Sequence, residues 1–70
     1  MNFSFKFYQK MKSDLSEQAY LKAFEIAKWL EGVPRDEWAD TIHTACNSRD
    51  YIGGCGVAVE SWFNRNLLWN

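Results

Sequence analysis

Hydrophobic residues in this chain recur mostly at intervals of three and four, the spacing of an amphipathic helix. The clearest such segment follows Ser16, a serine that can cap a helix N-terminus, and extends to about Glu31. Gly32 is expected to end this helix as a left-handed residue, and Pro34 lies just beyond it, where a helix cannot continue. The pattern therefore predicts a helix over residues 16–31 with one broad apolar face.

A second helix is predicted from Pro34 to near Cys46 or Asn47. Proline loses no needed amide hydrogen in a first turn, and acidic side chains there favour the positive end of the helix dipole. The apolar positions lie on one side of this segment and comprise Trp38, Ala39, Ile42, Ala45 and Cys46. The polar positions lie on the other side and comprise Asp36, Glu37, Asp40, Thr41, His43 and Thr44. This division is typical of a helix on the surface of a small core.

The two ends of the chain have less definite patterns. From Val57 onward, apolar residues share a face at helical spacing and indicate a third helix, although the glycines of residues 53–56 also permit a short hairpin over residues 51–59. Phe3, Phe5 and Phe7 alternate with polar residues as in a strand, but Phe7 and Met11 also pair on a helix, which we favour.

The fold class that follows is all-α, a small bundle of three to four short helices forming a single domain over residues 1–70. An α+β fold with an N-terminal strand or the hairpin over residues 51–59 is the alternative. The predicted core comprises Tyr20, Ala23, Phe24, Ala27, Leu30, Trp38, Ile42, Ala45, Val59, Trp62 and Phe63.

The composition is that of a globular protein, with 47% hydrophobic and 24% charged residues. There are only two cysteines, Cys46 and Cys55, and we expect neither a signal peptide nor a membrane span. These features predict a cytoplasmic protein with reduced thiols. Charge is distributed unevenly: the basic residues Lys6, Lys10 and Lys12 lie near the N-terminus, whereas acidic residues predominate between residues 31 and 60.

Aromatic residues are the most informative part of the composition. The chain has four tryptophans, three tyrosines and five phenylalanines among 70 residues. A domain of this size buries only about 60% of the surface that its unfolded chain exposes, so some rings are expected to face a partner. Trp29 is the most plausible anchor, because it falls on the polar side of the helix over residues 16–31.

Residues with catalytic or metal-binding potential do not form a recognisable motif. His43, Cys46 and Cys55, with Asp40 as a fourth ligand, match no paired spacing of a zinc site, and acidic neighbours disfavour a reactive thiolate. We interpret the cysteines as buried thiols and His43 as a surface residue. The prediction is a protein that is not an enzyme and has no cofactor and no metal, with a metal or thiol site at His43, Cys46 and Cys55 as a minor alternative.

Two binding functions remain. The basic N-terminus resembles a single-stranded nucleic-acid binder, in which lysines follow phosphates and aromatics stack on bases; Lys6, Lys10 and Lys12 would then form the site. Three lysines give a weak field, so protein binding is preferred. We predict a modulator or inhibitor that docks on a larger protein, such as a nucleic-acid-processing one, alone or as a homodimer. The predicted docking residues are Trp29, Asp36, Glu37 and Asp40.

Overall fold

The computed structural model describes residues 2–48 and 55–68, and within these ranges it contains helices and no strand. The elements in chain order are α1 (Phe5–Asp14), α2 (Glu17–Leu30), the 3₁₀ turn η1 (Arg35–Glu37), α3 (Trp38–Cys46), α4 (Cys55–Phe63) and the π-helical turn η3 (Asn64–Leu68). The all-α prediction is confirmed. The N-terminal segment is a helix and not a strand. Residues 51–54 of the alternative hairpin lie outside the described ranges, whereas residues 55–59 belong to α4.

Serine caps fix the starts of the first two helices. The Ser4 hydroxyl accepts a hydrogen bond from the Phe7 amide, and the Ser16 hydroxyl accepts one from the Ala19 amide, both at 3.2 Å. Each bond satisfies an amide that has no partner inside its own helix. The predicted helix start at Ser16 is therefore confirmed.

The prediction of a left-handed Gly32 was wrong, because the φ angle of this residue does not lie in the positive region. The helix instead closes by shorter backbone bonds. The Gly32 amide donates to the Trp29 carbonyl and the Val33 amide donates to the Leu30 carbonyl, each at 3.0 Å. Such three-residue bonds tighten the last turn and satisfy its carbonyls without a glycine conformation.

The helix predicted from Pro34 is divided into η1 and α3. Trp38 stands at this junction and joins it to the end of α2, since its indole nitrogen donates to the Val33 carbonyl at 2.8 Å. The Arg35 guanidinium covers the Trp38 ring at 4.6 Å and donates to the Leu67 carbonyl at 3.1 Å. The acidic first turn is therefore held against both α2 and η3.

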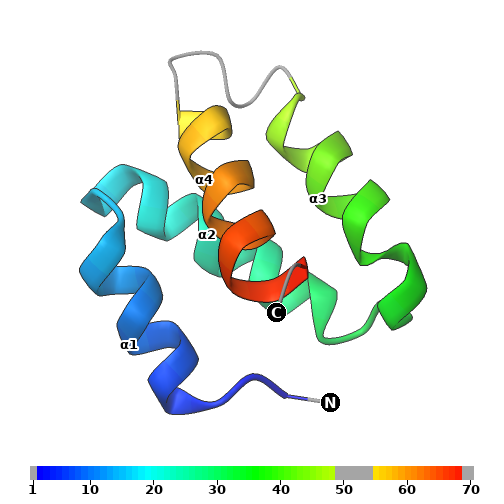
Figure 1. Cartoon of the computed structure of the whole chain (residues 1–70), viewed down its shortest axis with the longest axis horizontal. Coiled ribbons are helices and arrows are strands. Elements are labelled where there is room, and N and C mark those ends of the chain that lie inside the picture. The colour runs from blue at the N-terminus through cyan, green and yellow to red at the C-terminus, as the bar shows by residue number, and fades with distance from the viewer. Residues whose placement is uncertain (1, 49–54, 69–70) are drawn as a thin grey trace.

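Helix α4 packs against both α2 and α3, and α1 packs against α2 (Figure 1). The buried apolar residues form one cluster between them: Met11, Ala19, Ala23, Ile26, Ala27, Leu30, Trp38, Ile42, Cys46, Val59, Trp62 and Phe63. Most of the predicted core is confirmed. Three residues were placed too deep, since Tyr20 and Ala45 are only partly buried and Phe24 is 37% exposed. The Phe24 ring lies at the margin of the α1–α2 contact, between the rings of Tyr8 and Tyr20.

Much of the aromatic surface is used inside the domain. Phe3 stacks on Phe7 with ring centroids 4.4 Å apart, and Phe7 meets Trp62 edge to face at 5.3 Å. The indole nitrogen of the buried Trp62 donates to the Asp14 carboxylate at 2.9 Å, which joins the end of α1 to α4. These contacts explain how a short chain accommodates many rings, and they limit which rings remain for a partner. None of the helices described is long and apolar enough to cross a membrane.

Candidate protein-binding site

Trp29 is the most exposed aromatic side chain of α2. Its side chain is 56% exposed, whereas Trp38 and Trp62 are buried in the core. Trp29 lies near the C-terminal end of α2, on the edge that faces α3 and away from the edge that α1 covers. An indole ring in this position offers a wide apolar surface and has few rotatable bonds to immobilise on binding.

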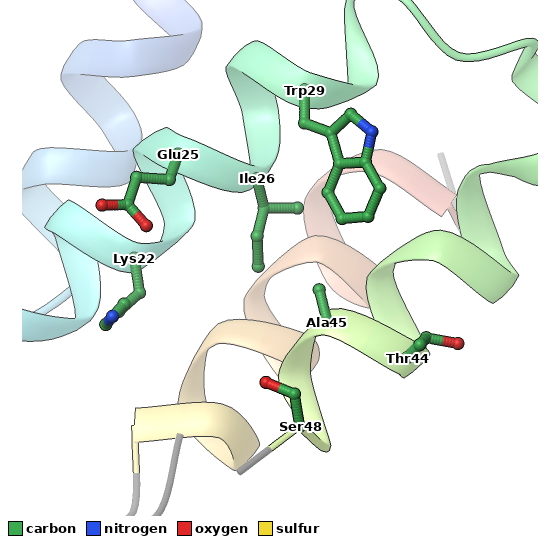
Figure 2. Close-up of a pocket in the computed structure, with 7 residues that line it drawn as sticks. All are labelled: Lys22, Glu25, Ile26, Trp29, Thr44, Ala45 and Ser48. Carbon is green, nitrogen blue, oxygen red and sulfur yellow. The ribbon is translucent and has the colours of Figure 1, made fainter. Parts of the chain in front are cut away.

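A groove of about 320 Å³ runs beside this ring, between α2 and α3. Figure 2 shows its lining, which consists of Lys22, Glu25, Ile26, Trp29, Thr44, Ala45 and Ser48. Trp29 and Ile26 project from α2 toward Ala45, and Lys22 and Glu25 lie toward the other end of the groove (Figure 2). The α3 wall carries small side chains, so the large residues of α2 have no bulky counterpart. The groove is mostly apolar and open.

The exposed side of α2 continues this surface as a ridge, Leu21–Glu25–Trp29, whose members are spaced by four residues. Leu21 is 54% exposed and Trp29 is 56% exposed. They are eight positions apart along the helix, a rise of about 12 Å or slightly more than two turns. Two apolar side chains therefore flank one carboxylate on the same outward row.

The acidic residues Asp36, Glu37 and Asp40 are exposed, the first two in η1 and the third in the first turn of α3. Asp36 borders a separate hollow together with Arg35, Ala39, Asn64 and Leu68. Among the described residues that line the Trp29 groove, none is one of these three acids. The structure therefore does not bring the predicted acidic strip and Trp29 into one pocket, although both belong to the α2–η1–α3 part of the molecule.

Lys6, Lys10 and Lys12 all lie on the exposed face of α1, around Phe5, which is 75% exposed. The Lys10 ammonium group is 3.3 Å from the Asp14 carboxylate, which weakens its attraction for phosphate. Phe7 and Tyr8, the other aromatics of this segment, are packed against the core. Of the rings in α1, Phe5 is thus the one best placed to stack on a base.

His43 is exposed, Cys46 is buried and Cys55 is only partly buried. His43 Nδ1 lies 2.8 Å from Glu60 Oε2, and this contact joins α3 to α4. Cys46 is buried, and burial, with the charge of Glu60 as a smaller cause, raises the pKa of its thiol to about 12. A thiol with so high a pKa is a poor nucleophile at neutral pH. Within the described ranges, no group of three or more His, Cys, Asp and Glu side chains is arranged to hold a metal ion.

Sequence reasoning placed Trp29 on an open face but missed the groove. Ala45 was assigned to the core and Thr44 to the polar face, whereas the two residues line the same wall. A signal was present in the sequence. Thr44 and Ala45 lie four and three residues before Ser48, so the C-terminal end of this segment carries only small side chains on one side. The angle between two helices decides whether that side is filled, and periodicity does not fix this angle.

Comparison with known proteins identified no relative of this chain. No protein-family model, curated protein or solved structure matches this chain. The groove and the ridge beside Trp29 are therefore the features of this chain from which a function can be proposed.

Proposed function

We propose that this chain is a non-catalytic interaction domain that modulates or inhibits a larger protein by docking on it through Trp29. The observation that carries this proposal is a tryptophan more than half exposed beside a mostly apolar groove, in a domain that buries Trp38 and Trp62 completely or nearly so. Exposed tryptophans next to desolvated pockets are common hot spots of protein interfaces.

The charges of α2, η1 and α3 favour a partner with a basic surface. Glu25, Asp36, Glu37 and Asp40 form no ion pair within the described part of the chain. Nearby cationic side chains are engaged internally, since Lys28 pairs with Glu31 at 3.2 Å and Arg35 is held between Trp38 and the Leu67 carbonyl. The α2–η1–α3 part of the molecule therefore carries a net negative charge, which would guide a basic protein surface toward it.

The test compares two exposed aromatics. Immobilised wild-type protein, Trp29→Ala and Phe5→Ala would be used to capture proteins from an extract of the native cells, with nuclease treatment of the captured material. We expect a captured partner protein that remains bound after nuclease treatment. Phe5→Ala should retain this partner and Trp29→Ala should lose it, because Trp29 borders the groove and Phe5 does not. Equal capture by all three proteins would contradict the proposal.

A second variant distinguishes nucleic-acid binding from protein binding. Lys6→Glu combined with Lys12→Glu reverses charge on the exposed face of α1 without touching the groove. If capture is lost in this variant and on nuclease treatment, but is unchanged in Trp29→Ala, the basic face of α1 is the binding surface and the domain binds nucleic acid.

A further inference from the structure

The walls of the Trp29 groove are two helices, and both present their side chains at helical spacing. On α2 the lining residues are Lys22, Glu25, Ile26 and Trp29. On the other wall they are Thr44 and Ala45 of α3 and Ser48, just beyond the end of α3. Rows spaced by three and four are the ridges that a third helix meets when helices pack ridge into groove. The small side chains on α3 allow such a helix to approach closely. This geometry favours a helical occupant over an extended one, which needs a free sheet edge for its backbone bonds.

The charge along the ridge indicates what that helix carries. Glu25 lies between the two exposed apolar residues Leu21 and Trp29, and it also borders the groove. Its carboxylate forms no ion pair within the described ranges, while Lys28 of the same helix is already paired with Glu31. Lys22 borders the far end of the groove and has interactions of its own. An occupant that covers Trp29 therefore meets a carboxylate one turn away, and a lysine or arginine complements it.

We propose that the groove binds one amphipathic, basic helix of the partner protein. This helix places an apolar side chain against Trp29 and Ile26 and a lysine or arginine opposite Glu25. The inference rests on the proposed function and specifies the partner segment that this function needs. An apolar anchor supplies affinity, and the ion pair at the exposed margin mainly fixes register and excludes acidic helices.

The test is a selection from a displayed library of helical peptides of random surface charge. Binders to the wild-type protein would be depleted against Trp29→Ala, sequenced, synthesised and titrated at two salt concentrations. The matched variants are Glu25→Gln, which borders the groove, and Glu17→Gln, on the first turn of the same helix and outside the groove. We expect the selected peptides to be rich in lysine and arginine, to lose roughly fivefold in affinity to Glu25→Gln, and to bind Glu17→Gln as they bind the wild type.

The outcomes distinguish the inference from the function on which it rests. Peptides that need Trp29 but are acidic, or are indifferent to Glu25→Gln, overturn the basic helix and leave Trp29 as a binding residue. If the selection yields no peptide whose binding depends on Trp29, the helical occupant is contradicted, whereas the proposed function is decided by the capture experiment with Trp29→Ala and Phe5→Ala.

Discussion

The two edges of α2 differ sharply, although they belong to the same 14-residue helix. The edge toward α1 is covered by aromatic rings and by a network of polar bonds, whereas the edge toward α3 ends in an open groove beside Trp29. Both edges carry large apolar residues in the sequence. The difference lies in what the neighbouring helix offers: α1 presents rings, and α3 presents small side chains.

Glu31 is the polar centre of the covered edge. Its Oε2 accepts a hydrogen bond from the Phe3 amide at 3.1 Å and another from the Tyr8 hydroxyl at 2.9 Å, while its Oε1 lies 3.2 Å from the Lys28 ammonium group. The bond from the Phe3 amide, with those from Tyr8 and Lys28, holds the pKa of Glu31 below its ordinary value. Burial and the bond to Glu31 raise the pKa of Tyr8. The N-terminal segment is thereby fastened to the end of α2.

The open edge has no such network among the described residues. Trp29 and Leu21 remain more than half exposed, and the groove of about 320 Å³ lies open beside Trp29. A domain this small has little apolar surface to spare, since a core of its size rarely supplies more than about 3–5 kcal/mol. We infer that the covered edge stabilises the fold and that the open edge is available for binding. Mutations on each edge, and in the core between them, should therefore have different effects.

The largest effect is expected from Trp62→Ala. Trp62 is fully buried, contacts the rings of Phe7 and Phe63, and donates to Asp14. Its removal leaves a large cavity and should cost about 3–5 kcal/mol, enough to unfold the domain. Loss of the helical far-UV circular dichroism signal at 25 °C checks this. A folded Trp62→Ala protein with an unchanged urea midpoint would show that α1 and α4 are not joined through this residue.

A smaller effect is expected from Phe24→Ala. From the sequence this residue was placed in the core, with a cost of about 3–5 kcal/mol on truncation. Since its side chain is 37% exposed and contacts mainly Tyr8 and Tyr20, we expect about 1–2 kcal/mol instead. Urea denaturation measures the difference. A cost as large as that of Trp62→Ala would show that the margin between α1 and α2 is as tightly packed as the core.

The helices themselves were predictable because their signals are local. Ser16, Pro34 and the apolar periodicity are read within a few residues, and they act in the folded protein much as they do in an isolated helix. The central positions Ala23, Leu30, Ile42 and Trp62 were also found, since a residue in the middle of an apolar face is buried whatever the exact packing angle.

The margins of the faces were not predictable in the same way. Burial of Phe24 depends on how far α1 extends over α2, and burial of Ala45 depends on how closely α3 packs against α2. Both are set by contacts distant in the sequence. The role of Glu31 was missed for this reason, because its bonding partners Phe3 and Tyr8 precede it by more than twenty residues. The candidate site lies at such a margin, so the sequence indicated its tryptophan but not its groove.

The pH dependence of stability in Glu31→Gln tests the contribution of the covered edge. The folded-state pKa of Glu31 lies below the ordinary value of 4.5, so its contribution to stability is fully present above that pH and is lost as the pH falls through the lower, folded-state pKa. Glutamine cannot ionise. We therefore expect the variant to be less stable than wild type at neutral pH, with the difference shrinking during acidification.

Urea denaturation of both proteins between neutral pH and the acid transition measures this change. Glu25→Gln is the control, since it removes one negative charge from the same helix but breaks no hydrogen bond within the described ranges. A difference between wild type and Glu31→Gln that stays constant over this pH range would exclude ionisation of Glu31 as the source of the stabilisation.

The smallest effect on stability is expected from Trp29→Ala, and it completes the comparison. The same chemical change that should unfold the domain at Trp62 should cost less than about 1 kcal/mol at Trp29, because more than half of this side chain is already in contact with water and no residue fills the groove beside it. Urea denaturation and circular dichroism of Trp29→Ala, measured beside Trp62→Ala, give the two values. If Trp29→Ala destabilises the domain by several kcal/mol, the α3 edge of α2 contributes to the core as the α1 edge does. The loss of a partner in that variant would then report unfolding and not a docking surface.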